Sequence, residues 1–555
     1  MTDAQFRTCA LFAIVFAAFL AYGNTLTNDF VWDDVSSVLL HRHVQDPGKL
    51  PQLFKEDFHA FGRGQGNFYR PLLAASFMLD FALSRPDPQQ KLSPVLFHIT
   101  NILWHAAAAA LFLALLRRFR APRPVCITVP LLFAVHPLNT QAVAYISGRG
   151  DPMAAAFLFA ALWFSLWEGT PARRVAGCAA GAACFVAAVL SKESAAVYPF
   201  LLTLLALLAP VQTTNERPSR SVWRGRAGCV VVGFLLTAGY AWLRATVLRF
   251  ADDSAPLSLG FVERGADALK ALSVYVKLLL APTHLHMDRT LDPVPQWAIG
   301  IGALLLILCV AGFLLSVRYG HRRLAAGLGW FLLTWFPISG LIPLNAQIAE
   351  HWMYLPMAGF LWAAAEGIWA LMRGNRVVQA AAAVLVFGVL LLFLGATAAR
   401  NRVWRDNETL FRDTLAKSPA SIRAHFNLAV TYEDILHNVA GARRHYERVI
   451  ALYKDKKSAS DAEDQFWPDE LEAHLSLGRI YAQRGDLSRA AGHFSVVLNV
   501  EPNEQNKALV AQAAVGMGQC FLAAGEPEKA QTFFDRAVQL SPGLEQKAGS
   551  VSPDL

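Results

Sequence analysis

Charged residues are scarce in this chain, and the scarcity is uneven. Only 17% of the 555 residues are charged, whereas 54% are hydrophobic and the mean hydropathy is +0.34. Soluble globular domains average about 25% charged residues. The long apolar runs lie within residues 1–400, and the remainder has an ordinary soluble composition. This distribution excludes a wholly soluble protein. It predicts a membrane domain at 1–400, a soluble domain at 401–545 and a disordered tail at 546–555.

Cysteine is also infrequent. The seven cysteines include no pair with a Cys-x-x-Cys spacing, and no group of histidines has the spacing of a zinc site. The spacings therefore signal neither a structural zinc site nor a disulfide framework.

About eleven apolar stretches are candidate membrane spans, since a helix needs about 20 mostly apolar residues to cross the hydrocarbon core. They lie at residues 7–23, 94–116, 125–146, 152–169, 175–191, 193–210, 228–247, 297–317, 325–344, 352–372 and 378–399. No small-x-small cleavage site follows the first stretch, which predicts an uncleaved span. Two amphipathic stretches, 70–83 and 266–281, are predicted to lie in the membrane interface. A span at 70–83 would change the count.

Arginine is distributed unevenly among the loops. Basic loops lie at 117–123, 173–174, 217–226, 318–323 and 373–376, whereas the alternating short loops at 148–151, 191–193 and 345–351 carry little net charge. Short basic loops stay in the cytoplasm. The pattern predicts a cytoplasmic N-terminus and, with an odd number of spans, a C-terminal domain on the other side. It also accounts for the net charge of +8 without nucleic acid as a partner.

The soluble domain contains an internal repeat. Three copies follow the offsets of tetratricopeptide repeats, the first more loosely because it has an extra residue in its turn. They contain Leu428, Ala429, Tyr432, Ala442 and Tyr446; Leu477, Gly478, Tyr481, Ala490, Phe494 and Pro502; and Met517, Gly518, Phe521, Ala530, Phe534, Ala537 and Pro542. A half repeat at 405–420 precedes full repeats at 422–455, 471–504 and 511–544, with a polar loop at 454–470. Stacked helix pairs of this kind form a concave groove. The groove is predicted to bind an extended peptide; the other interpretation is an unrelated array of helical hairpins.

Eight short motifs occur in order along the chain. They are Asn24-Thr25-Leu26 with Phe30-Val31-Trp32-Asp33-Asp34; Tyr69-Arg70-Pro71-Leu72; Phe97-His98 with Asn101 and His105; Phe133-Ala134-Val135-His136-Pro137; Gly148-Arg149-Gly150-Asp151; Ser191-Lys192-Glu193; Ala349-Glu350-His351 with Tyr354-Leu355-Pro356; and Ala399-Arg400-Asn401 with Trp404. With repeats following the last motif, this set resembles the transmembrane and tetratricopeptide-repeat O-mannosyltransferases of the C-type glycosyltransferase superfamily.

The resemblance implies an all-α fold, a polytopic glycosyltransferase-like helix bundle followed by a tetratricopeptide-repeat α-solenoid. It implies a polyprenyl-phosphate donor of a mannose-like sugar, Ser or Thr hydroxyls of a protein acceptor, and reaction on the non-cytoplasmic face. Ser191 and His351 stand where the family leads us to expect Cys and Arg, and the repeat array is short. The Ala- and Arg-rich composition favours a bacterial inner membrane with periplasmic repeats; in a eukaryote the repeats would lie in the lumen of the endoplasmic reticulum.

Three acids are the candidate catalytic residues. Sugar transfer from a lipid phosphate needs a carboxylate that takes the proton of the acceptor hydroxyl. Asp33 and Asp34 follow the first span, and the resemblance implies that the first acid of the pair is the base; a solvated turn or a helix cap is the structural alternative. Asp151 is a second candidate acid, near the acceptor or a metal, or else a helix N-cap. A divalent metal between Asp33 and Asp151 is compatible with the sequence, but the resemblance does not require one.

Four cations are candidate ligands of the donor phosphate, because such groups stabilise a leaving phosphate. They are Arg70, Arg149, Lys192 and His351, each of which could instead be an interfacial anchor. Glu193 and Glu350 are placed to orient these cations. His98, Asn101 and His105 share one face of a span, where polar residues are costly and often functional; helix-to-helix hydrogen bonding is the alternative. His136 and Tyr354 complete the set of candidate supporting residues.

Two classes of function remain open. The first is an inverting glycosyltransferase with a protein acceptor, or with a lipid or glycan acceptor. The second is a non-catalytic membrane scaffold whose repeats recruit partners. The acids discriminate between them, because a scaffold has no reason to gather Asp33, Asp34, Arg70 and Asp151 within roughly 10 Å of one another at one face.

The arginine pattern yields a test of orientation. A reporter fused after Leu116 is expected to be cytoplasmic, and one fused after Arg400 external, because the basic loops are held inside. Paired phosphatase and fluorescent-protein fusions measure both positions. A cytoplasmic readout after Arg400 would contradict the predicted topology.

Overall fold

The computed structural model describes residues 1–61, 67–84, 91–210, 220–248, 260–458, 466–503 and 506–541. These residues form helices and turns, and no β-strand occurs among them, so the predicted all-α class is confirmed. They divide into two compact units, Met1–Asp406 and Asn407–Leu555. The predicted tail at 546–555, Pro542, part of the polar loop at 454–470 and the start of the basic loop at 217–226 lie outside the described residues.

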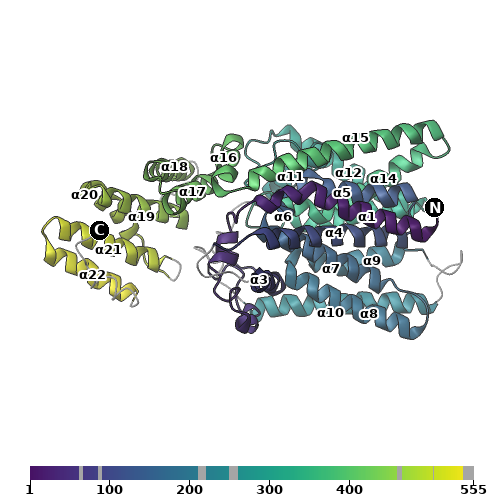
Figure 1. Ribbon diagram of the computed structural model, residues 1–555, viewed down its shortest axis with the longest axis horizontal. Coiled ribbons are helices and arrows are strands. Elements are labelled where there is room, and N and C mark those ends of the chain that lie inside the picture. The colour runs from purple at the N-terminus through teal and green to yellow at the C-terminus, as the bar shows by residue number, and fades with distance from the viewer. Residues whose placement is uncertain are drawn as a thin grey trace. The chain divides into compact units, whose positions relative to one another are not determined.

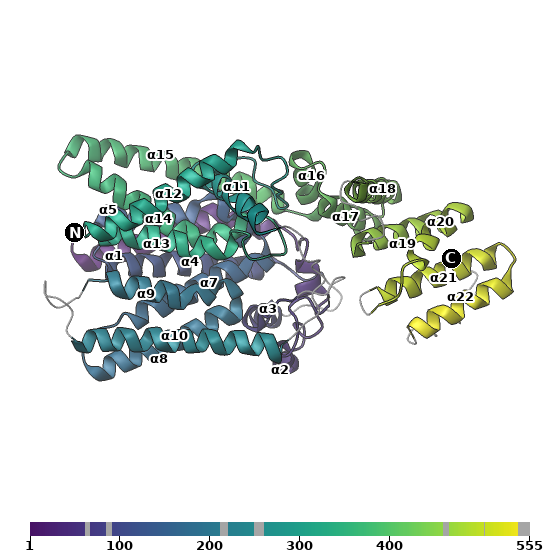
Figure 2. The same ribbon diagram turned by 180° about the vertical axis from the view of Figure 1, so that it is seen from behind.

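The first unit is a bundle of helices, most of which run along one direction (Figures 1 and 2). Its α-helices are α1 Asp3–Tyr22, α2 Leu50–Leu53, α3 Pro71–Ser84, α4 Val95–Arg118, α5 Arg123–Val135, α6 Thr140–Val143, α7 Gly150–Ser165, α8 Pro171–Ser191, α9 Tyr198–Leu208, α10 Arg220–Thr246, α11 Phe261–Leu280, α12 Trp297–Arg318, α13 Arg322–Trp335, α14 Tyr354–Met372 and α15 Arg376–Asn401. The two amphipathic stretches predicted for the interface are helical and fall within α3 and α11.

Among the described residues, seven helices are long and apolar enough to cross a membrane, and eight if a bent pair counts as one span. The seven are Asp3–Thr27, Val95–Arg118, Pro171–Ser191, Arg220–Thr246, Trp297–Arg318, Glu350–Met372 and Arg376–Trp404. The predicted spans at 152–169 and 325–344 correspond to α7 and α13, of 16 and 14 residues. At about 1.5 Å per residue these helices are shorter than the hydrocarbon core. The count of about eleven spans therefore stays a prediction.

The predicted span at 125–146 is broken. Helix α5 ends at Val135 and His136 is extended. The segment Pro137–Val143, which contains the turn Pro137–Asn139 and α6, is bent by 48° from α5. The Nδ1 atom of His136 accepts a hydrogen bond from the Leu138 amide at 3.2 Å, and its Nε2 lies 3.0 Å from the Leu279 carbonyl oxygen. Pro137 has no backbone N–H, so it can begin a helical segment without leaving a donor unpaired. The His136 side chain caps this segment by accepting from the Leu138 amide.

Glycine allows α13 and α14 to pack closely. A Cβ atom at Gly327 would lie 2.6 Å from the Ala363 nitrogen, and one at Gly359 would lie 2.5 Å from the Phe331 nitrogen. Small residues at such crossings are typical of helix packing in membranes.

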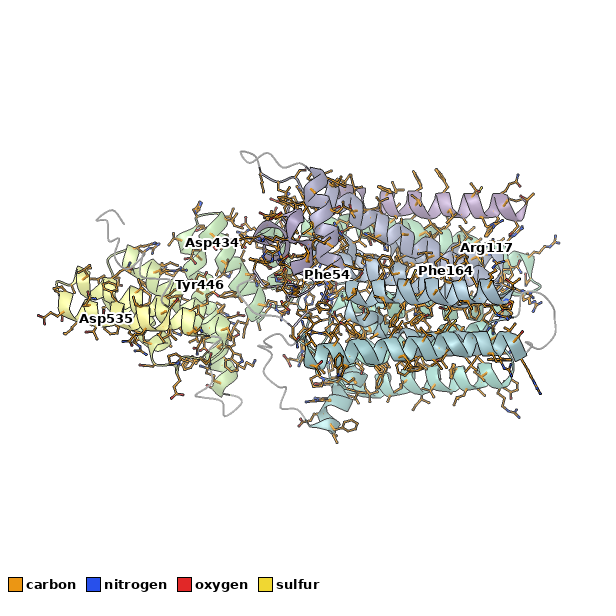
Figure 3. The ribbon with its side chains drawn as sticks, turned by 90° about the horizontal axis from the view of Figure 1, so that it is seen from below. Phe54, Arg117, Phe164, Asp434, Tyr446 and Asp535 are labelled. Carbon is orange, nitrogen blue, oxygen red and sulfur yellow. The ribbon has the colours of Figure 1, made fainter. Side chains whose placement is uncertain are left out.

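The basic loops gather at one end of the first unit. Arg117 pairs with Asp3 at 2.6 Å, and Arg323 donates to the Arg120 carbonyl oxygen at 3.2 Å. Figure 3 shows Arg117 and Phe54 at opposite ends of this unit. Chain segments that follow α1 and α15 meet at the second end, where Asn401 Nδ2 donates to Asn24 Oδ1 at 2.7 Å.

A buried acid ties the basic end together. Glu168 Oε1 accepts from Arg118 at 2.7 Å and from Arg226 at 2.8 Å, and all three side chains are buried. Arg118 also donates to the carbonyl oxygens of Leu166 and Pro210. Two guanidinium groups around one carboxylate keep the ends of α4, α7 and α10 in register, since buried charges must be paired.

The second unit consists of antiparallel helix pairs. Its helices are α16 Asn407–Lys417, α17 Ile422–Val430 with a π turn at Thr431–Ile435, α18 Val439–Ser458, α19 Pro468–Gln483, α20 Leu487–Leu498, α21 Lys507–Ala523 and α22 Pro527–Leu540. A Cβ atom at Gly478 would lie 2.4 Å from Phe494, and one at Gly516 would lie 2.5 Å from the same ring. Phe494 therefore fills the space between one helix pair and the next, as the repeat pattern predicts for an aromatic residue there.

The predicted repeat register leads to a test of stability. Ala530 is buried where α21 and α22 meet, whereas Ala523 is exposed at the end of α21. Ala530→Asp buries an unpaired carboxylate, which costs several kcal/mol, so it should lower the melting temperature of the unit. Ala523→Asp is the control and should change it little. Thermal melts followed by limited proteolysis measure both variants, and equal melting would show that the register is wrong.

Candidate functional site

The turn that follows α1 positions the acid pair. The Val31 amide donates to Asp34 Oδ2 at 3.0 Å, and the Asp34 amide donates to the Val31 carbonyl oxygen at 3.0 Å. Between them Trp32 has a φ of 52°, a conformation that costs a bulky residue about 1–3 kcal/mol. Its ring stacks on Tyr145, with centroids 5.5 Å apart. Backbone strain held in place beside a carboxylate is a common property of functional sites.

Asp34 is buried and fully engaged. Its Oδ1 accepts from the Ser147 amide at 2.7 Å and from the Ser147 hydroxyl at 2.6 Å. Burial raises the pKa of Asp34 to about 7, against the three hydrogen bonds, which lower it. Asp34 therefore fastens the turn to the segment that leads into α7.

Asp33 is more accessible than its neighbour. Its side chain is half-buried, and its carbonyl oxygen accepts from the Ser37 amide at 2.8 Å and the Ser37 hydroxyl at 2.6 Å. The Asp33 charge acts on the buried Tyr145 hydroxyl. Of the two acids, Asp33 is the more exposed.

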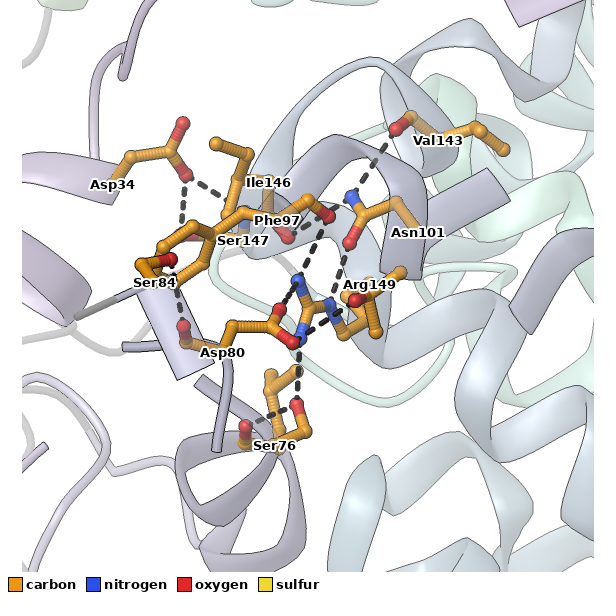
Figure 4. A network of polar contacts seen from close by, with 12 residues as sticks. Asp34, Ser76, Asp80, Ser84, Phe97, Asn101, Val143, Ile146, Ser147 and Arg149 are labelled. Carbon is orange, nitrogen blue, oxygen red and sulfur yellow. Dashed lines mark hydrogen bonds and ion pairs between the residues drawn. The ribbon is translucent and has the colours of Figure 1, made fainter. Parts of the chain in front are cut away.

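Arg149 lies in a buried polar network (Figure 4). It pairs with Asp80 at 2.6 Å and donates to Asn101 Oδ1 at 2.5 Å, to Ser76 Oγ at 3.1 Å and to the Phe97 carbonyl oxygen at 2.9 Å. Asn101 in turn donates to the carbonyl oxygens of Val143, Tyr145 and Ile146. The guanidinium of Arg149 also lies over the Phe77 ring.

This network corrects the role predicted for Arg149. The side chain has 0% exposure, so no phosphate reaches it from outside, and its donors already bind α3 and α4. The physical reason is that a buried guanidinium must be paired. Sequence reasoning overlooked its partner Asp80, although an acid within the apolar helix Pro71–Ser84 was a signal for a buried ion pair.

The cations Arg70 and Lys192 form a second cluster with two acids. Arg70 makes a forked contact with Glu193, at 3.0 Å and 2.5 Å, and Lys192 pairs with Asp151 at 2.7 Å. Lys192 and Glu193 are adjacent, and the charge of Arg70 acts on Asp151. Glu193 thus contacts one of the cations that it was predicted to orient, and four predicted residues meet at the starts of α3 and α7 and the end of α8.

His351 and Glu350 are adjacent in the chain but interact with different residues. The charges of Lys192 and Arg70 both act on His351, which places it with the second cluster. Glu350, predicted to orient these cations, instead accepts from the His286 amide at 2.8 Å and from Arg289 at 3.1 Å. That prediction was wrong, because α11 and the following turn bring Arg289 to Glu350 from 61 residues away.

The polar face of α4 is buried, and structural partners are found for Asn101 and His105. His105 Nδ1 lies 2.6 Å from the Tyr354 hydroxyl, and His105 Nε2 lies 3.0 Å from the Ala134 carbonyl oxygen. His98 is 1% exposed. Together with the contacts of Asn101 and His136 described above, these bonds hold helices together. Within the described residues no group of three His, Cys, Asp or Glu side chains is arranged for a metal ion.

The two clusters are close along the chain. Asp34 is bound to Ser147 and Lys192 to Asp151, and the turn Ile146–Arg149 joins these two anchor points. Four residues of such a turn cover about 8 Å. The acid pair and the Arg70 cluster are thus anchored to the same turn, at the end of the unit opposite the basic loops.

Comparison with known proteins agrees with this arrangement. The chain is 25% identical to protein O-mannosyl-transferase TMTC3 of Mus musculus, over 90% of this chain and 56% of that protein. It is 26% identical to TMTC4 of Mus musculus, over 77% of this chain and 64% of that protein, and 25% identical to TMTC1 of Homo sapiens, over 85% and 59%. The resemblance to the transmembrane and tetratricopeptide-repeat O-mannosyltransferases is confirmed.

The extent of this similarity has limits. The chain spans between half and two thirds of the length of these relatives. No family model matches the chain, and no solved structure matches it. With its seven candidate spans and these relatives, the chain is a multi-pass membrane protein.

The buried network of Arg149 can be tested by removing one charge. Asp80→Asn keeps the shape of the side chain and leaves the Arg149 charge unpaired, which should cost about 3–5 kcal/mol of stability. Asp29→Asn is the control, because Asp29 forms an exposed pair with Lys91 and such pairs contribute about 0–1 kcal/mol. Thermal unfolding of the detergent-solubilised chain measures both. Equal shifts would contradict the structural role of Asp80.

Proposed function

We propose that the chain is a membrane glycosyltransferase that moves a sugar, mannose by analogy with its relatives, from a polyprenyl-phosphate donor to Ser or Thr hydroxyls of a protein. The observation that carries the proposal is the convergence of Asp33, Arg70, Lys192 and Asp151 at one end of the first unit. A scaffold has no need of this convergence, and the similarity to protein O-mannosyl-transferases supports the same reaction.

Asp33 is the proposed general base. It accepts the proton of the acceptor hydroxyl as that oxygen attacks the anomeric carbon of the sugar. The bond between the anomeric carbon and the phosphate oxygen breaks, and the phosphate leaves from the opposite face with the bonding electron pair. A single displacement of this kind inverts the configuration of the sugar. Asp34 holds the turn that carries Asp33.

Arg70 and Lys192 are the proposed ligands of the donor phosphate, with His351 beside them. Arg70 is 13% exposed and its partner Glu193 is 46% exposed. Because Glu193 is the more exposed partner, the Arg70 fork can turn from this carboxylate to a phosphate, which offers the same paired acceptor oxygens. Lys192 is buried against Asp151 and supplies a fixed positive charge. Asp151 therefore positions Lys192. A divalent metal is not needed for this scheme.

The topology and the repeats complete the proposal. With about eleven spans, the basic loops lie in the cytoplasm and the acid end faces the other side, which is the periplasm in a bacterium and the lumen of the endoplasmic reticulum in a eukaryote. The helix pairs of the second unit form a tetratricopeptide-repeat solenoid that binds the acceptor peptide. The polyprenyl tail lies among the apolar helices.

The base is tested by a pair of substitutions. Asp33→Asn keeps size but removes basicity, and it should lower the rate of sugar transfer about 10²–10⁴-fold. Asp34→Asn should act mainly on folding, because the new amide hydrogens would face the Val31 amide or Ser147 donors that the carboxylate accepts. Transfer of radiolabelled sugar from polyprenyl-phosphate mannose into protein is measured at equal membrane abundance.

Each outcome bears on a different claim. Near wild-type transfer by Asp33→Asn would contradict the assignment of the base to Asp33. Activity in Asp33→Asn, Asp34→Asn and Asp151→Asn alike would contradict the carboxylate mechanism. A wild-type chain with no transfer to protein, lipid or glycan would leave the scaffold function.

A further inference from the structure

Helices α16, α17 and α18 of the second unit line an open basic pocket. It has a volume of about 410 Å³ and is lined by Arg412, Leu415, His425, Leu428, Tyr432, Arg444, His445 and Arg448. The three arginines are exposed, the two histidines are half-buried and Tyr432 is buried. Charged groups thus form the rim, and aromatic and apolar groups form the floor.

The positive charge of this pocket is not balanced by the described residues around it. Arg412 pairs with Glu408 at 2.8 Å and donates to the Tyr432 hydroxyl at 2.7 Å. For Arg444 and Arg448, the described residues contain no carboxylate within 4 Å. These two arginines lie four residues apart on α18, so they share a face and repel each other. The repulsion stabilises nothing in the unit, but it suits an anionic ligand.

The histidine pair on the floor is neutral and oriented. His425 Nε2 lies 3.1 Å from the Pro419 carbonyl oxygen and must carry the proton there, so His425 Nδ1 accepts from His445 Nδ1 at 2.9 Å. His445 therefore carries its proton on Nδ1, and its Nε2 is unprotonated. Burial first, then His425, Arg444 and Arg412, lower the pKa of His445 to about 4. The positive charges of Arg444 and Arg412 therefore both act at the His445 ring.

The second helix pair, α19 and α20, has the same arrangement of two histidines and a tyrosine but lacks the two arginines of α18. His474 Nδ1 lies 3.0 Å from His493 Nδ1, and His493 stacks on Tyr481 as His445 packs on Tyr432. The positions that correspond to Arg444 and Arg448 hold Gly492 and Val496. The His–His–Tyr arrangement is therefore shared by the first two helix pairs. The second pair has neither arginine, whereas in the third pair Arg536 stands at the position of Arg448 and Thr532 at that of Arg444.

From this juxtaposition we infer that the pocket bounded by Arg412, Arg444 and Arg448 binds an acidic side chain of an extended protein segment. A guanidinium group binds a carboxylate through two parallel hydrogen bonds, and the flanking leucines contact the methylene groups of a glutamate. The volume accommodates a side chain with its adjoining backbone, which is more than an isolated ion needs. The inference does not rest on the sugar-transfer proposal, since binding needs no donor.

The test measures peptide binding by the full-length chain in detergent. The probe is a short fluorescein-labelled peptide of alternating Glu and Ser, and its twin carries Gln in place of Glu. Fluorescence anisotropy should show binding of the Glu peptide only, weakening as ionic strength rises. Arg444→Gln and Arg448→Gln should each weaken it about tenfold, the loss of one charge-assisted hydrogen bond. Arg484→Gln, at an exposed arginine outside the pocket, is the matched control.

Stability separates loss of binding from loss of folding. Removing one of two repelling arginines should leave the melting temperature unchanged or raise it, so a weakened variant is still folded. Equal affinity for the Glu and Gln peptides, no binding of either, or equal loss in the Arg484→Gln control would overturn the inference. Displacement by inorganic phosphate or glycerol 3-phosphate at the concentration of the peptide would also overturn it, in favour of a free anion or a lipid headgroup.

Discussion

The buried charge of Arg149 is the constraint on which the rest of the site depends. A guanidinium without access to water must be paired, and here Asp80, Asn101 and the Phe97 carbonyl oxygen provide the partners. Because Arg149 lies in the turn Ile146–Arg149, its pairing fixes the backbone on both sides. Ser147 on one side receives Asp34, and Asp151 on the other receives Lys192. A motif that resembles a ligand site therefore acts as the joint that holds two clusters in place.

Sequence alone predicted which residues come to this end of the bundle but not how they pair. A polar residue in an apolar segment signals cost and hence a partner, and Arg70 and Lys192 do have acidic partners, Glu193 and Asp151. The partner depends on tertiary packing across long separations: Arg70 meets Glu193 over 123 residues, and Arg289 meets Glu350 over 61. Spacing along a helix carries no information about such pairs, so the prediction for Glu350 failed.

The membrane fold shows a similar division. Hydropathy located the long helices α4, α8, α12 and α15, because each has a continuous apolar run. It overlooked the break at His136 and Pro137, since averaging over a window hides a polar residue that serves as a cap inside an apolar stretch. The short helices α7 and α13 raise the same difficulty. Their apolar residues extend into turns, so composition measures a longer segment than the helix itself.

In the second unit, packing residues and ligand residues follow different rules. The offsets of Gly478 and Phe494 were readable from the sequence because every helix pair needs a small residue opposite an aromatic ring. The histidine pairs recur for the same reason, since they join the two helices of a hairpin. Arg444 has no counterpart in either of the following pairs, and its charge opposes that of Arg448. Residues that break a repeated pattern at a cost to local stability are best explained by an interaction outside the unit, and an acidic ligand relieves that cost.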